Sequence, residues 1–293
     1  MASTLKKYQT NPKNLLETAI AFYRSKKIKT AVVEGTCDRR FLQQWTKFDA
    51  PIRFDGFDGK DLVLKAYDGA QTGAFLKHDF LYFFSDIDFD EITGENIVEH
   101  PKYINNAYCS TTKKVEYNDL EIFLINTAAL EKVLVNHDIE ASEANVIRDR
   151  LESTSRLAGS FRAADILVTK KNGLRRSILN GLEPSAYFNS KTITLDRDAL
   201  LDQMPRWANH PNYLDELIDE ADTMASSAVS PWSLSRGHDV TEFLALHLTA
   251  RTKYQIARER LELMLRLACE LDEYKNSPMG RKLLASKEDC FLK

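Results

Sequence analysis

The chain has 293 residues, of which 43% are hydrophobic and 28% charged, and this globular composition excludes a fibrous or disordered protein. Its formal net charge of −3 argues against a surface that is basic throughout, so any contact with nucleic acid is expected to be local. The four cysteines are scattered without a CxxC pair, which fits reduced thiols in the cytosol. The sequence shows neither a signal-peptide pattern nor a long apolar stretch, and we expect a cytoplasmic protein without membrane contact.

The first part of the chain predicts alternating helices and strands. Apolar residues at helical spacing predict a helix over 12–25, and the run 30–34 predicts a strand directly after it. A helix, a strand and a helix are then expected over 37–45, 51–54 and 59–70. The five apolar residues from Phe80 to Phe84 predict a strand that is buried on both faces of a parallel sheet.

The same pattern defines the first of two expected domains. Residues 106–110 and 119–125 predict two more short strands, or one strand and the start of a helix. Together these elements predict an α/β domain over residues 1–135, with a parallel sheet flanked by helices and an N-terminal helix in front of it.

Beyond residue 135 the pattern becomes charged and amphipathic, which predicts a mostly helical region over 136–293. The helical patterns cover 140–168, 213–226, 240–251 and 255–274. The last of them is expected to form one packed helix, because its apolar residues keep to one side. A loop rich in Ser, Pro and Gly is expected over 226–239.

Acidic residues follow two of the predicted strands. Glu34 ends the strand over 30–34, and Asp86, Asp88 and Asp90 follow the strand over 80–84. The carboxyl ends of parallel strands meet at one edge of a sheet. Carboxylates that lie close together at this edge would repel one another and destabilise the fold. A divalent cation such as Mg²⁺ or Mn²⁺ would neutralise this repulsion. The alternative is that Glu34 is a solvated strand end and that the aspartates form an acidic turn.

Gly35 and Asp38, which follow Glu34, favour a turn that takes part in binding metal or substrate. Gly35 would allow a tight turn and a close approach of a phosphate to the backbone. Asp38 opens the next helix, where a carboxylate complements the positive end of the helix dipole, and it could also reach the metal or substrate.

These motifs resemble those of the TOPRIM domain, the metal-dependent catalytic module of topoisomerases, bacterial primases and overcoming-lysogenization-defect nucleases. The likeness covers residues 28–126 and consists of VVEGTCD at 32–38 and FFSDID at 83–88. Three further pieces resemble a narrower TOPRIM-like family that includes the nuclease subunit of the PARIS anti-phage system. They are DIDFD at 86–90, YNDLEIFLI at 117–125 and RGHDVTEFLAL at 236–246.

The resemblance implies a nuclease effector of anti-phage defence. It implies that Glu34 is a general acid/base or metal ligand, that Asp86 and Asp88 bind metal, and that Asp90 and Glu121 are further ligands. The implied substrate is RNA, with transfer RNA as the substrate in PARIS, and the implied partner is a separate ABC-type ATPase. An active homodimer is also expected. The alternatives are a nuclease that cuts DNA and a non-catalytic TOPRIM-shaped scaffold subunit.

Several basic residues are candidate contacts for substrate phosphates. They are Lys60, Lys113, Lys114, Arg236 and His238. Surface lysines are more often simply solvated. In the RGHD stretch, the structural alternative is that Asp239 caps the following helix while His238 packs between parts of the fold.

Overall fold

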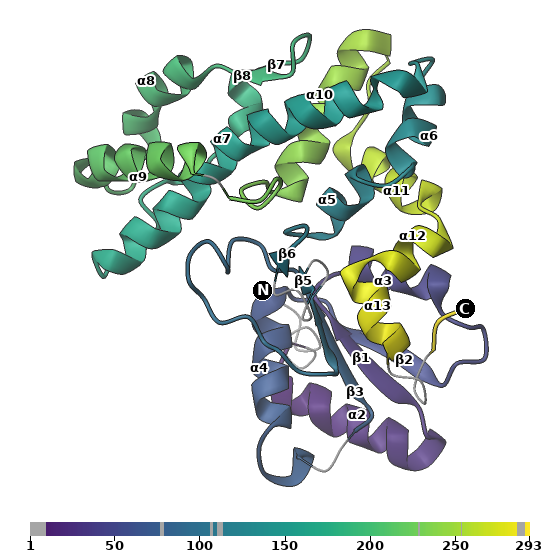
Figure 1. The fold of residues 1–293 in the computed structure, drawn as a ribbon. Coiled ribbons are helices and arrows are strands. Elements are labelled where there is room, and N and C mark those ends of the chain that lie inside the picture. Colours follow the sequence, from purple (N-terminus) through teal and green to yellow (C-terminus); the bar gives the residue numbers. More distant parts are fainter. Residues whose placement is uncertain are drawn as a thin grey trace. The chain divides into compact units, whose positions relative to one another are not determined.

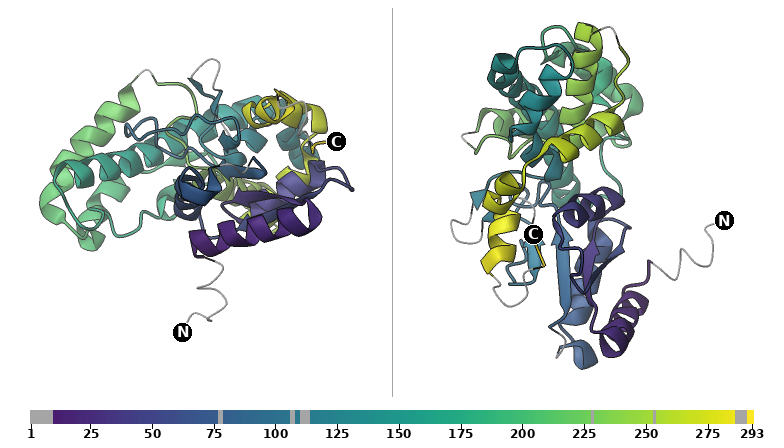
Figure 2. Two further views of the ribbon diagram at one scale, coloured as in Figure 1. Left: turned by 90° about the horizontal axis from the view of Figure 1, so that it is seen from below. Right: turned by 90° about the vertical axis from the view of Figure 1, so that its right-hand side faces the viewer.

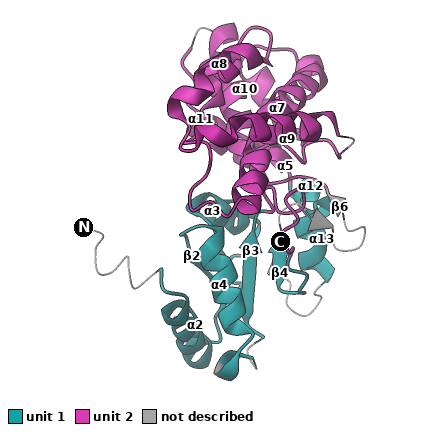
Figure 3. Ribbon diagram, turned by 90° about the vertical axis from the view of Figure 1, so that its left-hand side faces the viewer, with its two compact units in different colours: residues 1–86, 98–113, 271–293 teal, residues 87–97, 114–270 magenta. Residues whose placement is uncertain are grey.

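The computed structural model describes residues 10–76, 79–105, 108–109, 114–227, 229–252, 254–285 and 291–293. The chain divides into two compact units, which are teal and magenta in Figure 3, and Figure 1 labels their helices and strands. Unit 1 comprises residues 1–86, 98–113 and 271–293, and unit 2 comprises residues 87–97 and 114–270. Each unit has its own hydrophobic core.

Within its described residues, unit 1 contains a four-stranded parallel sheet in the order β2-β1-β3-β4. The strands of unit 1 are β1 (Lys29–Val33), β2 (Ile52–Gly56), β3 (Leu81–Ser85), β4 (Tyr103–Asn105) and the separate β5 (Tyr108–Cys109). Its helices are α2 (Pro12–Lys26), α3 (Thr36–Trp45), α4 (Lys60–Ala70), α12 (Leu271–Asn276) and α13 (Pro278–Ala285). The predicted α/β class and parallel sheet are confirmed.

The central strands are buried on both faces, as their apolar sequences predict. On one face, Val32 of β1 and Phe83 of β3 join a core with Leu16 of α2 and Val63 of α4. Helix α2 lies beside the strands and against α4, as the two views of Figure 2 allow the reader to follow. Helix α2 begins at Pro12 because the side chain of Asn11 accepts hydrogen bonds from the first free backbone N–H groups.

The C-terminal residues return to unit 1. The fully buried ring of Tyr274 in α12 lies 5.3 Å from the ring of Phe41 and stacks on Trp45 at 5.8 Å, both in α3. The ring of Phe291 meets Tyr82 of β3 at 5.4 Å. The observed division differs from the expected boundary at residue 135, because residues 87–97 and 114–135 belong to unit 2 and aromatic packing attaches α12 and Phe291 to unit 1.

Unit 2 is mostly helical, as expected. Its helices are α5 (Leu120–Ile125), α6 (Ala129–Val135), α7 (Ala144–Lys171), α8 (Arg197–Trp207), α9 (Leu214–Ser226), α10 (Gly237–Thr252) and α11 (Arg258–Ala268). Its short strands are β6 (Lys114–Val115), β7 (Phe188–Asn189) and β8 (Thr194–Leu195), and β7 pairs antiparallel with β8. One core of unit 2 surrounds Phe161 of α7 and includes Phe89, which is why residues 87–97 belong to this unit.

One predicted element differs from the structure, one open alternative is decided by it, and one strand was not predicted. Of the two alternatives for residues 119–125, a strand or the start of a helix, the structure has the helix, because Asp119 caps α5 by accepting a hydrogen bond from the Ile122 N–H. Residues 255–274 do not form one helix, because the extended backbone of Cys269 separates α11 from α12. The short strand β4 was not predicted, since three residues carry too little pattern.

None of the helices in the described part of the chain has both the length and the apolar character needed to cross a bilayer.

The packing of Tyr274 predicts a large effect of its removal on stability. Tyr274→Ala is expected to lower the free energy of unfolding by about 3 kcal/mol or more, because it leaves a cavity between α12 and α3. Urea denaturation measures this loss. The control is Tyr254→Ala, since Tyr254 is 76% exposed and its removal is expected to change stability by less than about 0.5 kcal/mol. Equal losses in both variants would contradict this packing.

Candidate functional site

Two carboxylates lie at the carboxyl edge of the sheet in unit 1. Strands β1 and β3 are parallel neighbours with Val33 opposite Phe84, so Glu34 and Asp86 follow at the same edge. The backbone N–H of Asp86 donates a 2.8 Å hydrogen bond to Glu34 Oε1. Both residues are half-buried. A hydrogen bond to a carboxylate is strengthened by its charge, so this contact holds the Glu34 side chain at the end of β3.

The segments next to Glu34 carry two other predicted residues. Asp38 lies in the first turn of α3, and a Cβ atom on Gly35 would stand 3.1 Å from its Oδ2. The Gly59 N–H donates a 3.0 Å hydrogen bond to the Glu34 carbonyl oxygen. Lys60 then starts α4. Unit 1 therefore places Asp38 and Lys60 at the starts of two helices that adjoin the Glu34 segment.

Asp88 and Asp90 belong to unit 2, in the segment that directly follows Asp86. The N–H groups of Ile87 and Asp88 both donate to the Asn118 carbonyl oxygen, at 3.0 and 2.9 Å. Asp88 is exposed and has a φ of 54°, a left-handed conformation that aspartate adopts more readily than most residues. The shared acceptor therefore holds Asp88 next to the segment that carries Asp119 and Glu121.

Asp119 is a buried carboxyl group that the sequence analysis missed. It accepts hydrogen bonds from the N–H groups of Ile122 at 2.9 Å and Gly237 at 2.6 Å. Burial, with the nearby charges of Glu121 and Asp88, raises the pKa of Asp119 to about 8, although the two hydrogen bonds oppose the shift. Because a cation would offset this repulsion, the group has the electrostatics of a cation-binding region.

Glu121, a predicted ligand, lies with His238 and Glu262 in one cluster. The potential ligand atoms of these three side chains all lie within 4.8 Å of one another. His238 Nδ1 is 3.1 Å from Glu262 Oε1, and the Thr241 hydroxyl donates to the same oxygen at 2.9 Å. An imidazole with two carboxylates suits Mn²⁺ or Zn²⁺ better than Mg²⁺.

Arginine side chains already balance the charge of this cluster. Arg266 Nη1 lies 3.9 Å from Glu121 Oε1, and Arg258 Nε lies 3.5 Å from Glu262 Oε1. Burial alone would raise the pKa of Glu262, but the hydrogen bond and charge of His238, with Thr241 and Arg258, lower it below its usual range. A metal ion at the cluster would therefore have to displace or rearrange these cations.

The structural alternative for Asp239, in which it caps the following helix, is wrong. Helix α10 begins at Gly237, so Asp239 already lies in its first turn. Its carboxylate accepts two hydrogen bonds from Arg162, from Nε at 2.7 Å and from Nη2 at 2.8 Å. This planar, two-bond pairing is the strong form of an arginine–carboxylate contact. Asp239 therefore ties α10 to α7.

Arg236 and His238 line cavities of unit 2. A cavity of about 380 Å³ is bordered by Asp88, Arg162 and Arg236. A second, of about 280 Å³, is bordered by Arg162, Arg236, His238 and Arg258. The Arg236 side chain is 43% exposed, and its guanidinium is 3.8 Å from Asp239 Oδ1. The two cavities share Arg162 and Arg236, so cationic groups border the space next to Asp88.

The predicted residues thus fall into two groups. Unit 1 brings Glu34 and Asp86 together, and unit 2 brings Asp88, Glu121 and His238 to the region of Asp119. Asp90 is half-buried, and its carbonyl oxygen accepts a hydrogen bond from the Glu95 N–H. Lys113 lies outside the described residues, as does the side chain of Lys114, whose backbone belongs to β6.

Sequence reasoning missed Asp119, Arg162 and Glu262. A signal for Asp119 was present, since an acid two residues before Glu121 is the natural cap of a helix that starts there. Arg162 and Glu262 stand inside long amphipathic helices, where an isolated charge carries no local signal.

Comparisons with known proteins give no assignment. No protein-family model matches the chain, and no curated protein matches it. A function for this chain therefore has to be inferred from its side chains and their geometry.

The close approach at Gly237 gives a stability prediction. A Cβ atom there would stand 2.2 Å from Asp119 Oδ1 and 2.6 Å from Glu121 Cβ. Gly237→Ala is therefore expected to lower the free energy of unfolding by about 3 kcal/mol, since both neighbours are buried and must move. The control is Gly173→Ala, where the space is open and only the φ of 61° costs about 1 kcal/mol. Urea denaturation compares the two, and a smaller loss at Gly237 would contradict the close contact.

Proposed function

We propose that this protein is a divalent-metal-dependent endonuclease of the TOPRIM type. The observation that carries the proposal is the hydrogen bond between the Asp86 N–H and the Glu34 carboxylate at the carboxyl edge of a parallel sheet. This edge is where open α/β sheets place their chemistry. The hydrogen bond joins Glu34 of the first motif to Asp86 of the second, and the combination of these two motifs resembles the TOPRIM pattern.

The carboxylates offer the oxygen ligands that Mg²⁺ or Mn²⁺ prefers. In unit 1 the proposed ligands are Glu34 and Asp86, and in unit 2 they are Asp88, Asp90 and Glu121. A bound ion would polarise the scissile phosphate and lower the pKa of the attacking water. Glu34, held by the Asp86 N–H, would accept the proton of that water.

The proposed substrate is RNA, with transfer RNA as the first candidate from the family resemblance. Because the chain has a net negative charge, binding of RNA phosphates requires basic side chains near the proposed site. Arg236 and His238 border the cavity space near Asp88 in unit 2, and Lys60 follows Gly59 beside Glu34 in unit 1. These three side chains are the proposed phosphate contacts.

The proposed setting is bacterial anti-phage defence in the cytoplasm. By the same resemblance, a separate ABC-type ATPase would hold and release the nuclease, which would act as a homodimer.

Two alternatives share the fold. A nuclease that cuts DNA differs only in substrate. A non-catalytic scaffold subunit is favoured by one observation, which is that arginines already pair with three acids of unit 2: Arg162 with Asp239, Arg258 with Glu262 and Arg266 with Glu121. Such pairing lets unit 2 fold without a metal.

The role of Glu34 predicts a specific loss of activity. Glu34→Gln is expected to reduce cleavage of transfer RNA in Mg²⁺ by about 100-fold or more, because the amide accepts no proton and binds metal weakly. Purified variants are incubated with transfer RNA and plasmid side by side, and products are resolved on gels. Thermal melting checks that the variant is folded.

The matched control is Glu17→Gln on the exposed face of α2, which is expected to cleave like the wild type. Normal cleavage by Glu34→Gln would refute the assignment of Glu34. Cleavage of plasmid alone would favour the DNA nuclease, and wild-type protein that cuts neither substrate would favour the scaffold.

A further inference from the structure

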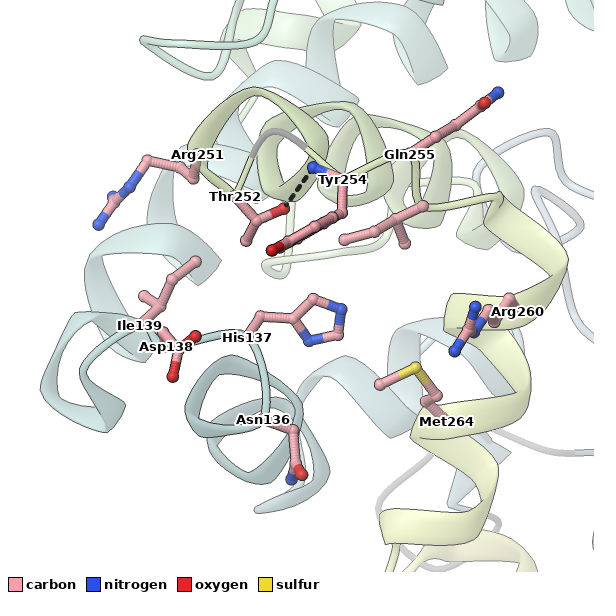
Figure 4. Close-up of a pocket in the computed structure, with 11 residues that line it drawn as sticks. Asn136, His137, Asp138, Ile139, Arg251, Thr252, Tyr254, Gln255, Arg260 and Met264 are labelled. Carbon is pink, nitrogen blue, oxygen red and sulfur yellow. Dashed lines mark hydrogen bonds between the residues drawn. The ribbon is translucent and has the colours of Figure 1, made fainter.

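Unit 2 contains a cavity of about 770 Å³ that the proposed chemistry does not use. It lies between the end of α6, the end of α10 and the first turns of α11, and Figure 4 shows its lining. Its volume falls within the range of about 300–1,000 Å³ that is typical of small-molecule sites. The cavity is therefore large enough for a ligand of that size.

Two aromatic rings face this cavity. Tyr254 is 76% exposed, which is unusual for a large aromatic side chain. The ring of His137 lies in the space between Tyr254 and Met264 in Figure 4. His137 Nδ1 is 2.9 Å from the Val133 carbonyl oxygen, which can only accept, so Nδ1 carries the proton. This bond fixes the ring and leaves Nε2 to meet a ligand.

One cation also faces the cavity. Figure 4 shows the guanidinium of Arg260 beside Met264, directed toward the cavity. Within the described part of the chain, no carboxylate forms an ion pair with Arg260. Arg251, on the opposite rim, is bound to Glu143 by two hydrogen bonds of 2.9 and 3.0 Å and points away. Of the lining residues that the structure describes, Arg260 is therefore the cation that can meet an anion in the cavity.

We propose that this cavity binds a nucleotide, with the base against Tyr254 and His137 and the phosphate on Arg260. Aromatic side chains stack on any base, and arginine binds phosphate with two parallel hydrogen bonds. Met264 and Ile256 add apolar contact beside the rings. A nucleotide combines a flat ring with an anion, which is the combination that these side chains match. The nucleotide is either free or an unpaired residue of a nucleic-acid strand.

The test is calorimetric titration of the full chain with AMP, with adenosine and with a short single-stranded RNA. Wild-type protein is expected to bind AMP saturably. Tyr254→Ala is expected to weaken AMP and adenosine binding about tenfold, because both ligands lose the stacked ring. Arg260→Gln is expected to weaken AMP binding about tenfold and leave adenosine binding unchanged, because only AMP carries the phosphate.

The matched control is Arg206→Gln, at an exposed side chain in the last turn of α8 that does not line the cavity, and this variant is expected to bind AMP like the wild type. Glu34→Gln is also expected to bind AMP normally, so this result is independent of the proposed nuclease activity. Tighter binding of the RNA than of AMP, lost in Tyr254→Ala, identifies a strand nucleotide as the ligand, whereas equal binding identifies free nucleotide. The proposal is overturned if AMP and RNA fail to bind, or if Tyr254→Ala and Arg260→Gln bind them like the wild type.

Discussion

The hydrogen bond from the Asp86 N–H to the Glu34 carboxylate ties together the ends of two neighbouring parallel strands. A parallel sheet puts both strand ends at one edge, so two acids that are about fifty residues apart in the chain become neighbours. The buried side chains on both faces of β1 and β3 hold the two strands in register, and this register sets the position of Glu34. Any chemistry at this edge depends on that packing.

In unit 2 the dominant constraint is the cost of burying like charges. Asp119 is held between two backbone donors, and burial and neighbouring acids raise its pKa. At Asp239 the buried negative charge is instead neutralised by Arg162, which donates two hydrogen bonds to the carboxylate. A carboxylate can be buried without a large loss of stability where a cation or a proton neutralises its charge. Asp239 already has its cation in Arg162, whereas Asp119 has none among the described residues that neutralises it. A cation bound near Asp119 would therefore stabilise unit 2 more than one bound near Asp239.

The sequence was sufficient for features with a strong local signal. The apolar runs of β1 and β3 predicted the buried parallel strands, and the apolar spacing over 12–25 predicted α2. Contacts between distant residues were not predictable. Asp119 and Gly237 are 118 residues apart, and their contact depends on how α5 and α10 pack. The sequence predicted that Tyr274 belongs to one long helix over 255–274. Its contact with Phe41 depends on the packing of distant aromatic rings, which no local sequence pattern predicts.

The central claim is that the carboxylates at the sheet edge bind a divalent cation. Calorimetric titration with Mn²⁺ tests it directly, because binding is measured without substrate, partner or activity. Saturable binding by the wild type that weakens about tenfold or more in Asp86→Asn, with an unchanged melting temperature, is the predicted result. A wild-type chain that shows no saturable Mn²⁺ binding, or an Asp86→Asn variant that binds Mn²⁺ equally well, would contradict the account.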